Sequence, residues 1–282
     1  MDSLELPHLR ALTHSRPSLV YLPPQKLITL AIPQLINSRL EMTHSTQATV
    51  QLSLLPRADG SASYSENGLS VIGTVNGPLE VSRRDENPEE AVVDVTIRPV
   101  VGSGGTRERH LESIIKSTLR QIILVYEFPR TLIQVTLQIT STPESENVGY
   151  KGARAGSNLL SLPALLQTAT MALLSASIPL SLTVTSTCIA LAPPSSSKSV
   201  IQNPSLLEAQ AADSVHVFSF TCHGDLLLAE SEGVFSLANW NNVYEFAKEI
   251  CCSVEIGGKR ENIANYIKSN LHSQISIGLG SK

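Results

Sequence analysis

Apolar and polar residues alternate along several short segments of the chain. The alternation covers residues 50–54, 69–75, 93–97 and, most regularly, 133–139. A period of two places successive side chains on opposite faces of a strand. Each segment is therefore predicted to be a β-strand with one buried and one solvent-facing side.

Two stretches follow the helical period instead. The first is predicted to run from the glycine-rich loop at 102–105 to Pro129, because its apolar residues share one helical face: Leu111, Ile114, Ile115, Leu119, Ile122 and Ile123. The second is predicted over 163–177, with Pro163 at its first position. A long polar loop at 141–158 lies between the two.

The rest of the chain continues with strands and then helices. We expect a strand at 182–191 and a hairpin of 215–221 with 226–229, turning at Cys222-His223-Gly224-Asp225. Helices are predicted at about 237–253 and 260–272. Because the order lacks a regular βαβα alternation, the fold class predicted is α+β with a mixed sheet.

Four segments are expected along the chain. Residues 1–46, rich in proline, are predicted to be a partly disordered or loosely docked extension. Residues 47–192 form the first part of a domain and 193–213 a polar linker loop. Residues 214–282 are expected to complete the same domain.

Charge is scarce in this sequence. Of its 282 residues 16% are charged, against about 25% in typical domains, and the formal net charge is −4. This balance argues against an RNA or DNA binder that relies on overall positive charge, and 42% hydrophobic residues argue against general disorder. From Ala155 to Ser197 no residue is charged, but prolines and hydroxyl side chains interrupt the run, so a buried helix and strand are predicted rather than a membrane span.

Few motifs indicate chemistry. The loop Gly102-Ser103-Gly104-Gly105-Thr106-Arg107 precedes a helix and could hold a phosphate, but it matches no nucleotide-binding pattern, so a plain mobile loop is favoured. The histidines form no metal-binding spacing, the four cysteines contain no CxxC pair, and no GxSxG motif occurs. The acidic run from Asp85 to Glu90 is interpreted as a solvated loop. We predict no metal site and no cofactor.

Several segments, in this order and spacing, resemble the RNase-PH-like subunits of the eukaryotic RNA exosome ring. The resemblance covers about 47–255 and rests on Arg57-Ala58-Asp59-Gly60-Ser61-Ala62, Gly77-Pro78, Glu108-Arg109, Phe128-Pro129-Arg130-Thr131, and Gly224-Asp225 through Glu232-Gly233-Val234-Phe235. It implies an RNase-PH-like fold (ribosomal protein S5 domain 2-like), with mixed sheets packed by helices. It also implies a heterodimer with another such subunit inside a six-membered ring, RNA-binding cap subunits, RNA, and no membrane. The expected location is the nucleus and nucleolus, and also the cytoplasm.

Active members of this family cleave RNA from its 3′ end with inorganic phosphate. Arg109 matches the family's phosphate-contacting arginine. The family's second phosphate loop, Gly-Gly-Thr-Arg, is matched here by the acidic segment 141–147, and its two aspartates by Asn203 and Ala209, with Glu208 beside the second. The resemblance therefore predicts a ring subunit that guides RNA in 3′-to-5′ processing, including ribosomal RNA maturation, and that has no catalytic residues.

Arg83, Arg84, Arg107 and Arg109 are the predicted RNA contacts; the alternative is that they are ordinary surface arginines. Two other functions stay open. One is an active phosphate-dependent 3′-to-5′ exoribonuclease that uses Glu208 with Asp213. The other is an assembly module unrelated to RNA.

Overall fold

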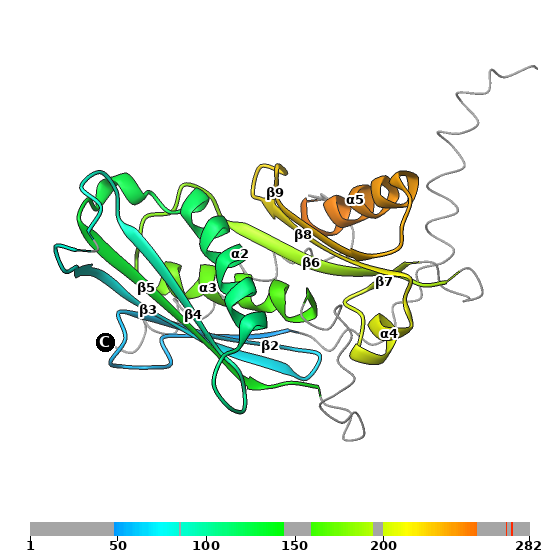
Figure 1. Ribbon diagram of the computed structural model, residues 1–282, viewed down its shortest axis with the longest axis horizontal. Helices are drawn as coiled ribbons and strands as arrows, with labels where there is room; N and C mark the ends of the chain where they lie inside the picture. The colour runs from blue at the N-terminus through cyan, green and yellow to red at the C-terminus, as the bar shows by residue number, and fades with distance from the viewer. Residues whose placement is uncertain are drawn as a thin grey trace, which may run out of the picture. The chain divides into compact units, whose positions relative to one another are not determined.

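The computed structural model describes residues 48–84, 86–143, 159–193 and 200–252, together with Ser269 and His272 (Figure 1). The predicted extension at 1–46 lies outside these residues. So does the predicted helix at 260–272, apart from the two isolated positions. Among the described helices, none has the length and apolar character that a membrane span requires.

The first sheet has five strands in the order β1-β2-β3-β5-β4. They are β1 (Thr49–Leu52), β2 (Gly60–Glu66), β3 (Leu69–Glu80), β4 (Val92–Arg98) and β5 (Thr131–Ser141). β4 runs parallel to β5, whereas the other neighbours are antiparallel, so the predicted mixed sheet is confirmed. The clear alternation at 133–139 lies within the central strand β5, with its odd-numbered residues buried.

One face of this sheet is covered by helices α2 (Thr106–Ile122) and α3 (Leu162–Ser175) (Figure 1). Val75, Val95 and Val135 lie on that face in register, and the apolar stripe of α2 packs against the same core. The predicted helix ends at Ile122, and a short 3-10 turn at Val125–Glu127 leads into β5. A second such turn, Leu159–Ser161, precedes α3.

The second sheet has the order β7-β6-β8-β9. Its strands are β6 (Val184–Leu191), β7 (Val200–Gln202), β8 (Ser214–Thr221) and β9 (Leu226–Gly233). The predicted hairpin around 222–225 is confirmed as β8–β9. Both faces of β8 are buried, because Val217 belongs to the core around α3 and Phe218 packs with α5 (Leu237–Cys252) on the other side.

Helix α3 lies between the two sheets. It contacts β2 and β3 on one side and β6 and β8 on the other, and twelve of its fourteen residues are buried. A helix that is apolar all round is expected where packing surrounds it. The uncharged run thus corresponds, within its described part, to a core helix and the core strand β6, as predicted.

Two glycines allow α3 to approach the first sheet closely. A Cβ atom added at Gly60 would lie 2.3 Å from the amide nitrogen of Ala176, at the end of α3. One added at Gly73 would lie 2.8 Å from the Thr168 side chain. The atoms that this Cβ would meet include the backbone of Ala172 and Ala176, which cannot move aside as a flexible side chain can. Position 60 therefore accepts only glycine.

Three elements were not predicted from the pattern. β2 consists mainly of small and hydroxyl residues, and its burial comes from α3 rather than from apolar alternation. The predicted linker loop at 193–213 contains β7 and the short helix α4 (Leu206–Ala211). The sequence did hold a signal for α4, since Ser205 and Glu208 form a capping box.

His216 is fully buried in β8 and both its ring nitrogens have hydroxyl partners. Nε2 lies 2.9 Å from Ser214 Oγ, and Nδ1 lies 2.9 Å from Ser231 Oγ on β9. The Phe235 ring packs edge-on against the imidazole, with the ring centroids 4.8 Å apart. Burial lowers the pKa of His216 from 6.5 to about 4, because the interior disfavours the charged imidazolium.

Gly60→Ala is expected to destabilise the protein by about 3 kcal/mol, because the new methyl group overlaps the backbone at the end of α3. Denaturant unfolding of the purified chain measures this change. Ser63→Ala, on the opposite face of β2, is the matched control and should stay within about 0.5 kcal/mol. Equal stability of the two variants would contradict the close approach.

The free energy of unfolding is expected to decrease as the pH falls from about 6.5 towards about 4, because the unfolded chain binds a proton that native His216 does not. The slope from this one group approaches about 1.4 kcal/mol per pH unit. His216→Gln should remove this component, whereas His110→Gln, at an exposed position of α2, should retain it. Denaturant titrations at a series of pH values test the prediction, and identical profiles for both variants would refute it.

Candidate functional site

The parallel strands β4 and β5 end beside the N-terminus of α2, where the surface forms an open depression of about 580 Å³. Its wall includes the ends of β4 and β5, the glycine-rich loop and the first turn of α2: Thr96, Ile97, Arg98, Pro99, Val100, Gly102, Ser103, Gly104, Gly105, Glu108, Arg109, Glu112 and Gln138. The family resemblance matches Arg109 to a phosphate-contacting arginine. The depression is therefore the candidate site for binding an anion such as phosphate.

The carboxylates of this depression are bound to the protein's own amides. Glu108 Oε2 accepts a 2.7 Å hydrogen bond from the Gly105 amide, and Glu112 Oε1 accepts one of 2.7 Å from the Ile97 amide. On the other wall, Gln138 Nε2 donates to the Pro99 carbonyl at 3.1 Å. An anion at this helix start would meet the negative charge of Glu108, which already occupies one of the helix's free donors.

The four predicted RNA-contacting arginines fall into two groups rather than one site. Arg107 and Arg109 are exposed at the N-terminus of α2, beside the depression. Arg83 and Arg84 are exposed in the turn between β3 and β4, at the end of the sheet where β4 begins. A helix with the 17 residues of α2 is roughly 25 Å long, and it runs between these two ends.

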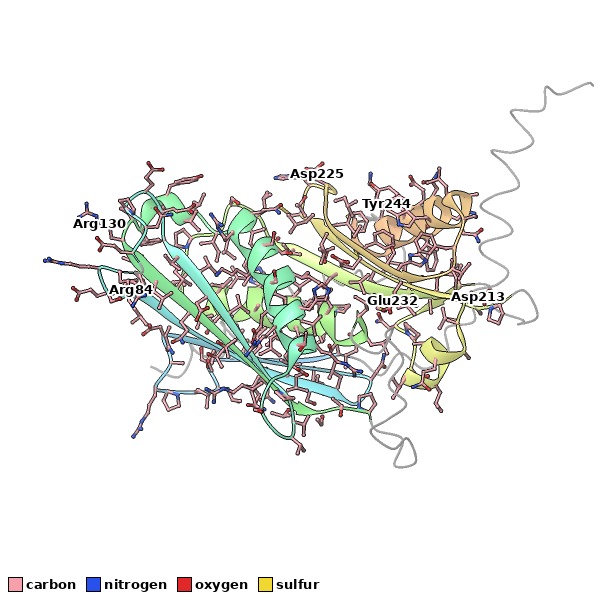
Figure 2. All side chains as sticks on the ribbon, in the orientation of Figure 1. Arg84, Arg130, Asp213, Asp225, Glu232 and Tyr244 are labelled. Carbon is pink, nitrogen blue, oxygen red and sulfur yellow. The ribbon has the colours of Figure 1, made fainter. Side chains whose placement is uncertain are left out.

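Further arginines lie near the Arg83 and Arg84 end. Figure 2 shows Arg84 and Arg130 at the same end of the first sheet. The Arg130 amide donates to the Asn87 carbonyl at 3.0 Å, and Arg120 forms a 2.5 Å ion pair with Glu90. Sequence reasoning did not predict Arg120 or Arg130 as part of this group, because only the parallel pairing of β4 and β5 brings their segments to the loop at 81–91.

The position matched to the family's first aspartate, Asn203, makes an intramolecular contact. Its Nδ2 atom donates a 2.7 Å hydrogen bond to Glu66 Oε1 at the end of β2. Glu66 also accepts a 2.6 Å bond from the Tyr64 hydroxyl. Burial raises the pKa of Glu66, although the two hydrogen bonds oppose that shift. Sequence reasoning missed Glu66 because the contact joins residues 137 positions apart.

The position matched to the second aspartate, Ala209, is buried in α4. The neighbouring carboxylate of Glu208 caps that helix, accepting bonds of 2.8 Å from the Ser205 amide and 2.9 Å from its hydroxyl. Asp213 is exposed, and its backbone pairs with Leu191 and Val234. The Glu208 and Asp213 alternative would therefore require Glu208 to leave its cap.

The matched second phosphate loop is described only at its start. Ser141 Oγ donates to the Gly68 carbonyl at 3.0 Å, and Thr142 and Pro143 follow. Residues 144–147, which carry the predicted acidic character, lie outside the described residues. In the described ranges, no three His, Cys, Asp or Glu side chains gather where a metal ion could be held.

Comparison with known proteins gives consistent matches. Residues 46–179 match the RNase PH family, described as "3′ exoribonuclease family, domain 1". The chain is similar to the exosome complex component RRP46 of Saccharomyces cerevisiae, with 27% identity over 233 residues, covering 80% of this chain and 98% of that protein. It is 36% identical over 91 residues to a protein of Oryza sativa subsp. japonica named exosome complex exonuclease RRP46 homolog, covering 32% and 38% of the two chains.

A solved structure agrees with the sequence matches. The crystal structure of rice (Oryza sativa) Rrp46 superposes with a TM-score of 0.61 and 25% sequence identity, covering 73% of this chain and 88% of that one. The two names above differ, one being a component and the other an exonuclease, so the names alone leave catalysis open. The RNase-PH-like α+β fold that the resemblance implied is confirmed, and the similarities to RRP46 proteins support an RRP46-like exosome subunit.

Proposed function

We propose that this chain is a ring subunit of the RNA exosome that has no catalytic site of its own. The observation that carries the proposal is the state of the two positions matched to the family's aspartates. Asn203 is an amide bound to Glu66, and Ala209 has no polar side chain. Phosphorolysis needs carboxylates that hold a metal ion or move a proton. Glu208 lies beside Ala209, but its carboxylate is hydrogen-bonded to Ser205 at the cap of α4.

The proposed partners follow from the same similarity. The chain forms a heterodimer with another RNase-PH-like subunit in a six-membered ring, to which RNA-binding cap subunits attach. The assembly carries out 3′-to-5′ RNA processing and degradation, including ribosomal RNA maturation, in the nucleus, the nucleolus and the cytoplasm. The support for this is the similarity to proteins named as exosome components.

RNA contact is assigned to the two arginine groups. Arg83 and Arg84 act at the beginning of β4, and Arg107 and Arg109 act at its end. Guanidinium groups at both ends suit an extended single strand, because phosphates contact positive charge along the backbone without any base being read. The overall charge of −4 leaves such local groups as the source of attraction.

Neither the full chain nor its complex with its ring neighbour is expected to degrade RNA when inorganic phosphate is added. Release of nucleoside diphosphates from a 3′-labelled RNA measures the activity, with a catalytic RNase-PH-like enzyme as positive control. Phosphate-dependent degradation that Arg109→Ala abolishes would overturn the proposal. Degradation lost in a Glu208→Gln/Asp213→Asn variant would instead establish the exoribonuclease alternative.

Affinity purification of the tagged chain gives the complementary control. The proposal expects a set of different RNase-PH-like subunits to copurify, identified by mass spectrometry. Recovery of the chain as a monomer at physiological concentration would favour an assembly module unrelated to RNA.

In the reconstituted complex, Arg83→Ala/Arg84→Ala and Arg107→Ala/Arg109→Ala are each expected to weaken binding of single-stranded RNA. Because each lost phosphate contact releases one counterion fewer, the slope of log affinity against log salt should decrease by about 0.7 per contact. Lys248→Ala, a cation on α5 beside the second sheet, is the control and should leave the slope unchanged. Unchanged slopes in both double variants would identify these arginines as ordinary surface residues.

A further inference from the structure

A half-buried carboxylate, Glu66, connects the two sheets. Glu66 ends β2 of the first sheet, and Asn203 follows β7 of the second sheet. The 2.7 Å bond from Asn203 Nδ2 joins them, and the Tyr64 hydroxyl binds the other Glu66 oxygen at 2.6 Å. Glu66 therefore has a donor on each oxygen, and one of the two donors comes from the segment that leads into α4.

Asn203 is fixed from its own side as well. Its backbone amide donates to the Cys188 carbonyl of β6 at 2.8 Å. Its φ angle of 46° lies in the left-handed region, which asparagine tolerates better than most residues. Its carbonyl accepts a 3.5 Å bond from Asn67 Nδ2, in the turn between β2 and β3. The two turns thus hold each other by side chain and by backbone.

The contact requires an amide opposite a carboxylate. A carboxylate only accepts hydrogen bonds, whereas an amide group also donates two. Between two described residues the one ion pair joins Arg120 and Glu90, so no described cation forms an ion pair with Glu66. The negative charge of Glu66 also contributes, after burial, to raising the pKa of the Cys188 thiol to about 12. A second carboxylate at position 203 would repel Glu66 unless one of the two takes up a proton, and at neutral pH that protonation costs stability.

We propose that Glu66 and Asn203 form a clamp that holds the β7–α4 segment, residues 200–211, against the first sheet. The clamp depends on the proposed function in one respect only, the matching of position 203 to the family's first aspartate. In this chain the position is a structural contact, and restoring aspartate there disrupts packing instead of supplying an acid. Glu66 and Asn203 are the two positions that must change together.

A double-variant cycle in the full chain tests the clamp. Asn203→Asp should lower the melting temperature by roughly 5 °C, and Glu66→Gln should lower it less, because one amide oxygen must then serve two donors. Glu66→Gln/Asn203→Asp should recover at least half of the Asn203→Asp loss, because the donor and the carboxylate have exchanged places. Asn242→Asp is the control, since it makes the same chemical change at an exposed position of α5, outside the two turns.

Hydrogen exchange locates the effect. Protection of residues 200–211 should fall about tenfold or more in Asn203→Asp and return in the double variant, while α2 stays unchanged. Additive single effects, or an Asn203→Asp variant as stable as the parent, would overturn the clamp.

If Asn203→Asp is recovered only as aggregate, a double variant that folds like the parent supports the clamp, and one that also aggregates refutes it. These measurements use no RNA and no phosphate, so they can fail independently of the proposed function.

Discussion

The burial of α3 between two sheets is the constraint on which the rest of the structure depends. A helix buried on nearly all sides cannot carry charge without a compensating partner, because an isolated charge in a protein interior loses its hydration. It also needs room, which the first sheet provides at Gly60 and Gly73. In α3 and β6, which make up most of the described part of the uncharged run from Ala155 to Ser197, the absence of charge is therefore a consequence of interior position.

The parallel pairing of β4 and β5 determines where the arginines proposed to contact RNA lie. A parallel pair requires a crossover, and α2 supplies it along the same face of the sheet as α3. Its start lies at one end of β4, next to Arg107 and Arg109, and its end lies near the loop of Arg83 and Arg84. Two arginine groups at opposite ends of one crossover are more suited to following an extended RNA strand than to binding a single phosphate.

The sequence predicted those elements whose own pattern of apolar residues indicates which side is buried. The alternation at 133–139 and the apolar stripe from Leu111 to Ile122 corresponded to β5 and α2. β2 was missed because its Gly, Ser and Ala positions are buried by α3, which is distant in sequence. The four arginines were predicted as RNA contacts, but their separation into two groups was not predicted, because it depends on the direction of β4 and β5. The contact between Glu66 and Asn203 could not be predicted, because it joins two turns from different sheets.

The scarcity of charge matters most for the carboxylates near the candidate site. Glu108 is bound to the Gly105 amide, Glu112 to the Ile97 amide, Glu208 to Ser205 and Glu66 to Asn203. Each of these acids satisfies a donor of the protein itself, at a helix start, at a strand end or between turns. To hold a metal ion or move a proton, such an acid would have to leave its donor, which at the starts of α2 and α4 means losing a helix-capping contact. These acids thus make hydrogen bonds within the fold, and the exposed arginines are the groups for which RNA contact is proposed.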